Sequence, residues 1–186
     1  MTTTLRQARV IAGVLLAMSL AVPAHSADRS LEFAVKSTFL YKFASFVEWP
    51  AGSFASDTAP FNLCVVGADP YGGRIEQAVA GQRVDKHPIA LRQLAKAEPQ
   101  SGCHAMLISG SSRQTAAEAL EAVAGTPTLT VTDSDLGSTA GIIHFVIVND
   151  RVSFDIDNVA AARNHLVISS KLLALAHSVR TAEGAR

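Results

Sequence analysis

The chain has 186 residues, a formal net charge of zero, 48% hydrophobic residues and 17% charged residues. This composition excludes an intrinsically disordered chain, which would be poor in hydrophobic residues. The charge balance argues against nucleic acid and other acidic surfaces as partners, because clustered Lys and Arg residues bind them.

The first 26 residues have the three parts of a cleavable export signal. Two arginines precede an apolar run over residues 10–22, and the small residues Ala24 and Ser26 precede a cut before Ala27. A cut after Ala24 is the alternative. The run is shorter than the roughly 20 residues that span a bilayer, so it does not predict a membrane anchor. We therefore predict an exported protein with a signal peptide over residues 1–26.

The mature chain, residues 27–186, has about 160 residues and is predicted to form one domain with a buried core. It begins with an amphipathic helix that ends before Pro50, because the residue before a proline avoids the helical conformation. Lys36 and Lys42 fall outside the apolar stripe of this helix. So many aromatic residues on one face favour packing into the core, and a groove for a partner is the alternative. The stripe consists of Leu31, Val35, Phe39, Phe43 and Phe46, widened by Leu40 and Val47.

Strands and helices alternate in the middle of the chain. Apolar runs predict strands at 61–67, 82–84, 88–91, 103–108 and 128–132, and helices at 74–80 and 114–124. Asp69 is predicted to cap the first of these helices, with Pro70 in its first turn. This alternation is typical of a mostly parallel sheet with helices on both faces.

The last third changes character. An apolar run over 141–148 and an alternating run over 151–157 flank Asn149-Asp150, which predicts a β-hairpin with a two-residue turn. A short helix over 159–163, a strand over 166–168 and a closing helix over 170–179, capped by Ser170, are expected to follow. The predicted fold class is therefore α/β, a single domain with a mostly parallel sheet flanked by helices and a C-terminal β-hairpin.

The two cysteines, Cys64 and Cys103, each begin an apolar run that is predicted to be a strand, and the two strands are predicted to be neighbours. An even pair in an oxidising compartment is expected to form a disulfide, which would stabilise the fold by roughly 4 kcal/mol in the chain-entropy model. Two buried thiols are the alternative. A metal site is not predicted, because the pair lacks the spacing of zinc ligands.

Signatures of catalysis are not found. The loop over 67–74 lacks the Gly-Lys-Ser/Thr ending of a phosphate-binding loop, and no Gly-x-Ser-x-Gly motif is present. Asp133 with Asp135, and Asp155 with Asp157, could hold a cation, but solvation at turns and strand ends is the favoured interpretation. The histidines are scattered along the sequence, so they do not predict a metal site. Taken together, these observations predict no cofactor and no enzymatic activity.

Several segments together resemble the YfiR family of bacterial periplasmic proteins. They include Phe-Val-Glu-Trp-Pro at 46–50, the segments 61–70 and 103–109, and Ile-Ser-Ser-Lys-Leu-Leu at 168–173. The resemblance implies a dimerising regulator that binds the periplasmic domain of a membrane-anchored diguanylate cyclase and inhibits it, which lowers cyclic-di-GMP signalling and affects biofilm formation and motility. The family's disulfide falls on Cys64 and Cys103, whereas the second cysteine pair of well-studied relatives is absent from this sequence.

The resemblance also suggests a surface for the partner. The predicted contact residues come from the most family-like stretch and are Phe154, Asp155, Asn158, Arg163 and Lys171. The alternative is that these residues hold the last strand and helix in place. A different function also stays open, namely a periplasmic small-ligand-binding sensor subunit for another receptor, such as a sensor kinase. A hydrolytic enzyme lacks support, because no nucleophile and base are paired.

Overall fold

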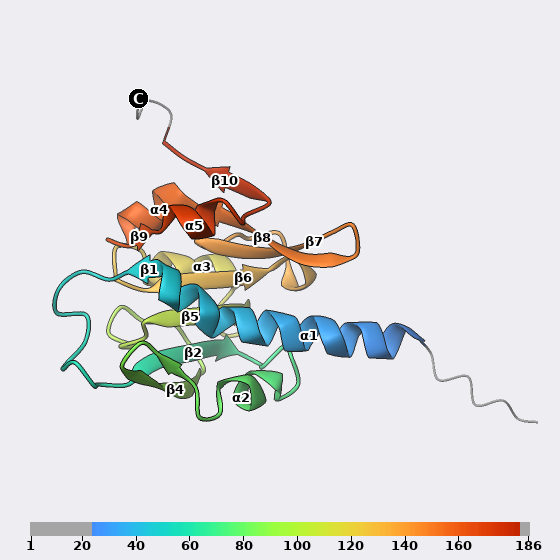
Figure 1. Ribbon diagram of the computed structural model, residues 1–186, viewed down its shortest axis with the longest axis horizontal. Coiled ribbons are helices and arrows are strands. Elements are labelled where there is room, and N and C mark those ends of the chain that lie inside the picture. Colours follow the sequence, from blue (N-terminus) through green and yellow to red (C-terminus); the bar gives the residue numbers. More distant parts are fainter. Residues whose placement is uncertain (1–23, 183–186) are drawn as a thin grey trace, which may run out of the picture.

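The structure, a computed structural model, describes residues 24–182. Its main feature is an eight-stranded sheet (Figure 1). Its strands lie in the order β10–β8–β7–β6–β5–β2–β4–β3. The five strands from β4 to β7 are mutually parallel, and β8 runs antiparallel to β7. The strands are β2 (Phe61–Gly67), β3 (Arg83–Val84), β4 (His87–Leu94), β5 (Ala105–Gly110), β6 (Leu129–Asp133), β7 (Ile143–Val148), β8 (Arg151–Asp157) and β10 (Ser178–Arg180).

Helices cover both faces of this sheet, as the alternation of strands and helices predicts. On one face, α1 (Ala24–Lys42) crosses the strands and packs beside α2 (Arg74–Val79) (Figure 1). On the other face, α3 (Ala116–Ala122) packs against β5. Side chains of β2 alternate between the two cores, since Leu63 and Val65 belong to the α1 side and Cys64 and Val66 to the α3 side. The mixed α/β fold is therefore confirmed.

The predicted disulfide is present. Cys64 on β2 is bonded to Cys103, which lies just before β5, and their Cα atoms are 5.9 Å apart. The strands β2 and β5 are neighbours in the sheet, as the two apolar runs predict. The bridge lies within the smaller core, on the α3 side, and both cysteines are buried.

The predicted hairpin is confirmed too. Its turn residues Asn149 and Asp150 have φ values of 50° and 58°, which gives the left-handed turn that suits a two-residue loop. On β8, Phe154 and Ile156 face the core and are buried. The short helix that follows is α4 (Asn158–Arg163), and the Asp157 carboxylate caps it by accepting the N–H of Ala160.

The predicted ends of the first helix and of the α2 helix are wrong. The α1 helix stops at Lys42 and continues as the 3₁₀ turn η1 (Phe43–Phe46) and the strand β1 (Val47–Glu48). The reason is tertiary, because β1 pairs with β9 (Val167–Ile168) in a separate two-stranded sheet. The residue that caps α2 is Gly73, whereas the Asp69 carboxylate accepts the N–H groups of Tyr71 and Gly73 in the preceding turn.

The predicted closing helix is also wrong over most of its length. The helix α5 (Ser170–Leu173) has one turn, and its cap is Ser169, whose side chain accepts the Leu172 N–H. The chain then turns and adds β10 beside β8. The N–H of His177 donates to the carbonyl of Phe154 over 2.8 Å. Pairing with an otherwise free sheet edge therefore overrides the helical pattern of the sequence.

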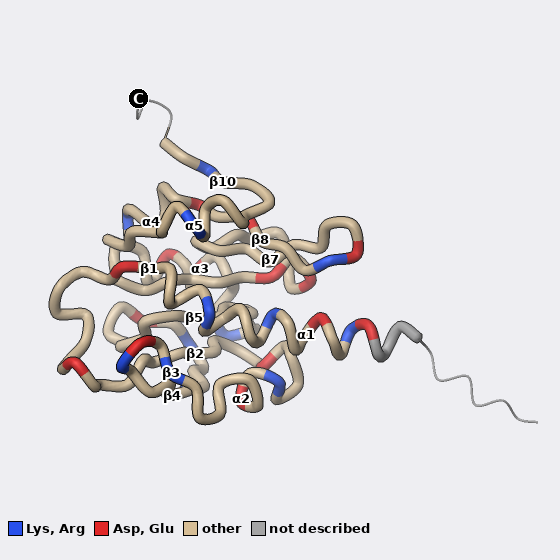
Figure 2. Tube along the Cα trace, viewed as in Figure 1, with Lys and Arg blue, Asp and Glu red and all other residues tan. Residues whose placement is uncertain are grey.

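Residues 1–23, which carry nearly all of the predicted signal peptide, lie outside the described residues. Among the helices of residues 24–182, none combines the length and the hydropathy that crossing a bilayer requires. Acidic and basic residues are interspersed along the elements in Figure 2, in agreement with the charge balance of the sequence.

Candidate functional site

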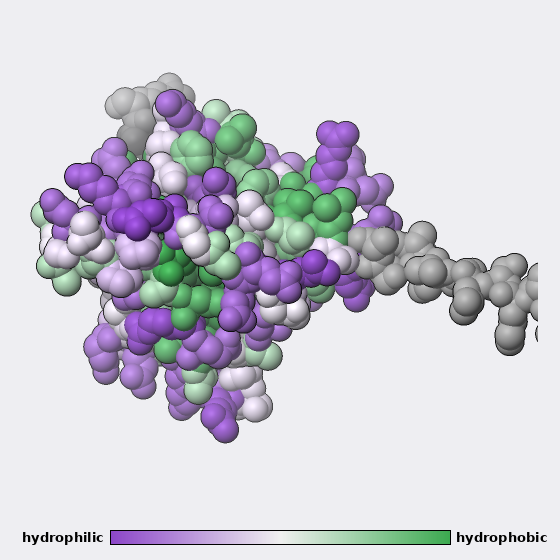
Figure 3. Space-filling view, turned by 60° about the horizontal axis from the view of Figure 1, so that its bottom comes forward, coloured by the Kyte–Doolittle hydropathy of each residue, from purple (hydrophilic) through white to green (hydrophobic). Residues whose placement is uncertain are grey.

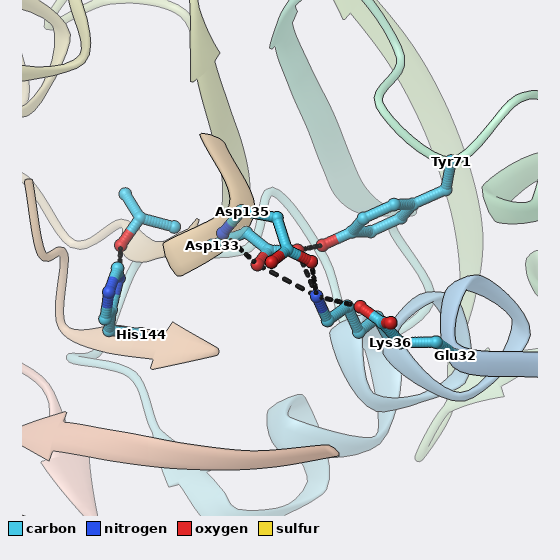
Figure 4. A network of polar contacts seen from close by, with 7 residues as sticks. Glu32, Lys36, Tyr71, Asp133, Asp135 and His144 are labelled. Carbon is cyan, nitrogen blue, oxygen red and sulfur yellow. Dashed lines mark hydrogen bonds and ion pairs between the residues drawn. The ribbon is translucent and has the colours of Figure 1, made fainter. Parts of the chain in front are cut away.

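A buried lysine lies where α1 crosses the sheet. Lys36 is 0% exposed, and its ammonium group lies 2.9 and 2.8 Å from the two carboxylate oxygens of Asp133 and 2.8 Å from Asp135 (Figure 4). Glu32, one helical turn earlier, supplies a third carboxylate. Tyr71 donates its phenolic hydrogen to Asp133 over 2.7 Å. We refer to Glu32, Lys36, Tyr71, Asp133 and Asp135 as the Lys36 network.

The fold explains why these residues meet. Asp133 is the last residue of β6, and its carboxylate accepts the N–H of Asp135 at the start of the 3₁₀ turn η2 (Ser134–Leu136). Tyr71 follows the end of β2. The carboxyl ends of parallel strands meet at one edge of the sheet, so both side chains reach the same place. The Lys36 network therefore joins α1 to the edge of the sheet at which open α/β folds commonly bind ligands.

This edge is closed where the strand order reverses, between β2 and β5. The backbone at Gly67 approaches Gly110 so closely that a Cβ atom on Gly67 would lie 2.5 Å from the Gly110 carbonyl oxygen. The Ser109 hydroxyl oxygen lies 2.8 Å from each of the carbonyl oxygens of Val66 and Ala68, which share its one hydrogen. At this point of the edge the loops after β2 and β5 are therefore in direct contact.

Contacts within the network favour the charged forms of Lys36 and Asp135. Burial lowers the pKa of Lys36, but hydrogen bonds to Asp133, Asp135 and Glu32 outweigh burial and raise it overall. The hydrogen bond from Lys36 lowers the pKa of Asp135. Burial and the Asp133 charge raise the pKa of Tyr71 far above its ordinary value, so the phenol stays protonated. No paired nucleophile and base result, and the arrangement works as a clamp on α1.

The sequence interpretation of Asp133 is wrong. Asp133 is 2% exposed and pairs with the fully buried Lys36, so it is not a solvated strand end. Asp155 and Asp157 are half-buried, and Asp155 pairs with His177 and Asp157 with Arg180. Within the described residues, no cluster of three or more His, Cys, Asp or Glu side chains is arranged for a metal ion.

The five predicted partner residues lie on three elements. Phe154 on β8 is buried against Phe39, Phe43 and Phe145, so it contributes to the core. Asp155 and Asn158 are half-buried, whereas Arg163 on α4 and Lys171 on α5 are exposed. Their contact with a partner stays a prediction.

An apolar pocket of about 250 Å³ is lined by Phe154 among the five predicted partner residues, whereas Arg163 lines a different hollow. Its walls come from α1, η1, β8 and α5, and Leu175, just after α5, is 65% exposed. The lining residues are Phe39, Lys42, Phe43, Phe46, Val152, Ser153, Phe154, Leu172 and Leu175. The aromatic stripe of the first helix was expected either to pack into the core or to form a groove for a partner. Phe43 is buried in the core, and the half-buried Phe39 and Phe46 also line a surface pocket.

A second hollow, of about 700 Å³, lies between α1 and the β7–β8 hairpin, and its lining is half apolar and half charged. Leu31, Val35, Ile147 and Val152 supply its apolar wall, and Leu31 and Ile147 are exposed. Figure 3 shows hydrophobic surface beside the start of the described part of α1. Both hollows are surface features, and Glu32 of the Lys36 network also lines the larger one.

The fold and its contacts thus define an α/β domain with a clamped helix and exposed apolar pockets. A family model described as YfiR/HmsC-like matches residues 33–177, and the chain belongs to this family. The family is periplasmic, regulatory and non-catalytic, which supports a regulatory role for this chain in general. No curated protein matches the chain.

Proposed function

We propose that this protein binds the periplasmic domain of a membrane-anchored diguanylate cyclase and inhibits it, lowering cyclic-di-GMP. Membership of the YfiR/HmsC-like family carries the proposal. The protein would act without chemistry of its own, by binding the inactive conformation of the cyclase more tightly than the active one. Deletion of the gene is expected to raise cyclic-di-GMP, measured by mass spectrometry of cell extracts.

The apolar pocket beside α5 supports one contact surface. A small apolar pocket with an exposed rim suits an apolar anchor side chain of a partner, and Lys42 at its edge suits a neighbouring carboxylate. Leu175→Asp should place a charge on this rim and raise cyclic-di-GMP as deletion does. Val167→Asp is the matched control, because Val167 is 59% exposed on β9 and does not line the pocket. Equal effects of the two variants would argue against this surface.

A charge reversal tests the predicted contact at Arg163. Arg163→Glu should raise cyclic-di-GMP and leave the circular dichroism spectrum unchanged, because Arg163 is exposed. Arg113→Glu, at an exposed position between β5 and α3, is the control. A membrane pull-down with the wild-type protein should recover the cyclase, and the Arg163→Glu protein should recover less of it.

The homodimer that the resemblance implies is part of the proposal. The hollow beside α1 supplies an apolar surface for it, because Leu31 and Ile147 are exposed there. Light scattering after size-exclusion chromatography should give twice the mass of the mature chain, and Leu31→Glu should reduce that mass. If deletion leaves cyclic-di-GMP unchanged while a small molecule raises the melting temperature, the ligand-sensor alternative takes the place of this function.

A further inference from the structure

The loop over residues 51–60, between β1 and β2, is held by an aromatic stack. The ring of Phe54 lies between two imidazoles, with centroid distances of 4.0 Å to His87 and 4.2 Å to His104. Trp49 and Phe61 extend the cluster, since their rings lie 5.6 Å apart. The loop thus lies over the amino ends of β2 and β5, whereas the Lys36 network lies at the carboxyl ends of the parallel strands (Figure 1).

The hydrogen bonds of His104 select one protonation state. Its Nδ1 accepts the backbone N–H of Asn62 over 2.9 Å, so Nδ1 carries no hydrogen. Its Nε2 lies 3.0 Å from the carbonyl oxygen of Ser53, which only accepts, so Nε2 carries the hydrogen. The residue is 8% exposed. Only the neutral imidazole satisfies both partners, one at the start of β2 and one in the loop.

Protonation of His104 breaks this arrangement. A hydrogen on Nδ1 would point at the Asn62 N–H, and the buried ring would gain a charge. His87 differs, because its Nδ1 lies 2.7 Å from the carbonyl of Ala59, a bond that the neutral and the charged ring can both donate. His104 is therefore the sensitive member of the pair.

The surroundings offer no compensating charge. His87 on β4 faces His104 across Phe54 and opposes a second positive charge. Asp57 is the acidic residue of the loop, and it is exposed. The ion pairs of the described residues involve neither His87 nor His104, and Cys103, next to His104, is in the disulfide. Burial is the main cause that lowers the pKa of His104.

We propose that the loop over 51–60 is a pH-responsive latch, closed while His104 is neutral and released when Nδ1 is protonated. Release uncovers Phe61 and the Trp49 ring beside it, which is new apolar surface on the amino-end side of the sheet. The open loop binds one more proton than the closed loop, so the latch is stable above the ordinary histidine pKa of about 6.5 and weakens as pH falls below it. The latch goes beyond the proposed function and does not depend on the identity of a partner.

Trp49 is the only tryptophan of the chain and reports on the latch directly. Its fluorescence should shift reversibly to longer wavelength between pH 8 and pH 4.5, while the far-ultraviolet circular dichroism stays constant. His104→Gln should remove the transition, whereas His177→Gln, at an exposed site far along the chain, should retain it. Loss of secondary structure over the same pH range, or an unchanged transition in His104→Gln, would overturn the proposal.

Hydrogen exchange on the wild-type protein avoids the risk that a variant fails to fold. After correction for the intrinsic rate, protection of the Asn62 amide should fall by up to about tenfold per pH unit as pH drops below the ordinary histidine pKa of about 6.5, because opening takes up one proton. The amides of β6, which lie away from the loop, should keep their protection. Constant protection of Asn62 down to pH 4.5 would refute the latch.

Discussion

Replacement of Lys36 by methionine tests the clamp on α1. Methionine matches the apolar stem of lysine, so the substitution removes the charge and leaves the packing largely in place. Asp133, at 2% exposure, would lose two contacts of 2.9 and 2.8 Å to the ammonium group. It would keep the Tyr71 hydroxyl and the Asp135 N–H as donors. The result is a buried carboxylate without its cation.

Loss of one partner of a buried ion pair costs about 3–5 kcal/mol of unfolding free energy. For a domain of this size, a loss of about 3 kcal/mol lowers the melting temperature by roughly 6–12 °C. Lys42→Met is the matched control, because Lys42 is an exposed residue on the same helix, and a surface change of this kind stays within about 0.5 kcal/mol. Urea unfolding followed by circular dichroism gives the change in unfolding free energy of each variant, from the shift of its midpoint when the slope is unchanged.

A second substitution separates charge from packing. Asp133→Asn in the Lys36→Met background removes the uncompensated charge and leaves an oxygen that accepts the Tyr71 hydroxyl hydrogen. The double variant should therefore lose less stability than Lys36→Met alone. The clamp does not hold α1 if Lys36→Met unfolds at the urea midpoint of Lys42→Met. Equal losses in the single and double variants would show that packing, and not charge, decides the effect.

Further predictions concern the disulfide, the mature end and the hairpin. Cys64→Ser should lower the unfolding free energy by about 2–5 kcal/mol, and non-reducing peptide mapping of the wild type should recover the Cys64–Cys103 link. Intact mass of periplasmic material should show a chain that begins at Ala27, or at His25 for the alternative cut, and one that begins at Met1 would contradict export by cleavage. Asp150→Gly should leave the urea midpoint unchanged or raise it, because φ is 58° there, whereas Asp150→Val should cost about 1–2 kcal/mol.

The sheet and its hairpin could be predicted because their signals are local. Apolar runs such as 61–67 and 103–108 predict strands whichever neighbours they pair with. Asn149 and Asp150 are residue types that tolerate the positive φ of the hairpin turn. The disulfide could be predicted because the two cysteines lie in two such runs that were expected to be neighbouring strands. The closing helix failed because its last residues gain more from β8 than from continuing the helix, and only the tertiary fold creates that free edge.

The Lys36 network could not be predicted from periodicity. A lysine outside an apolar stripe is normally solvated, and its partner Asp133 lies 97 residues away on a strand whose place in the sheet is unknown from sequence. The signal that was present is the pair Asp133 and Asp135 directly after a buried strand. Carboxylates at the carboxyl end of a parallel strand contact the element that packs over that edge of the sheet. Here that element is α1, which places the Lys36 ammonium group beside them (Figure 4).

The two polar sites respond to different ranges of pH, and this difference keeps the proposed latch local. The raised pKa of Lys36 and the lowered pKa of Asp135 keep that pair ionised where histidines titrate. The lowered pKa of His104 places its protonation below about 6.5, at the opposite end of the strands. Mild acid should therefore release the loop over 51–60 while α1 stays clamped, so the amides around Lys36 should keep their exchange protection at a pH where the Asn62 amide has lost it.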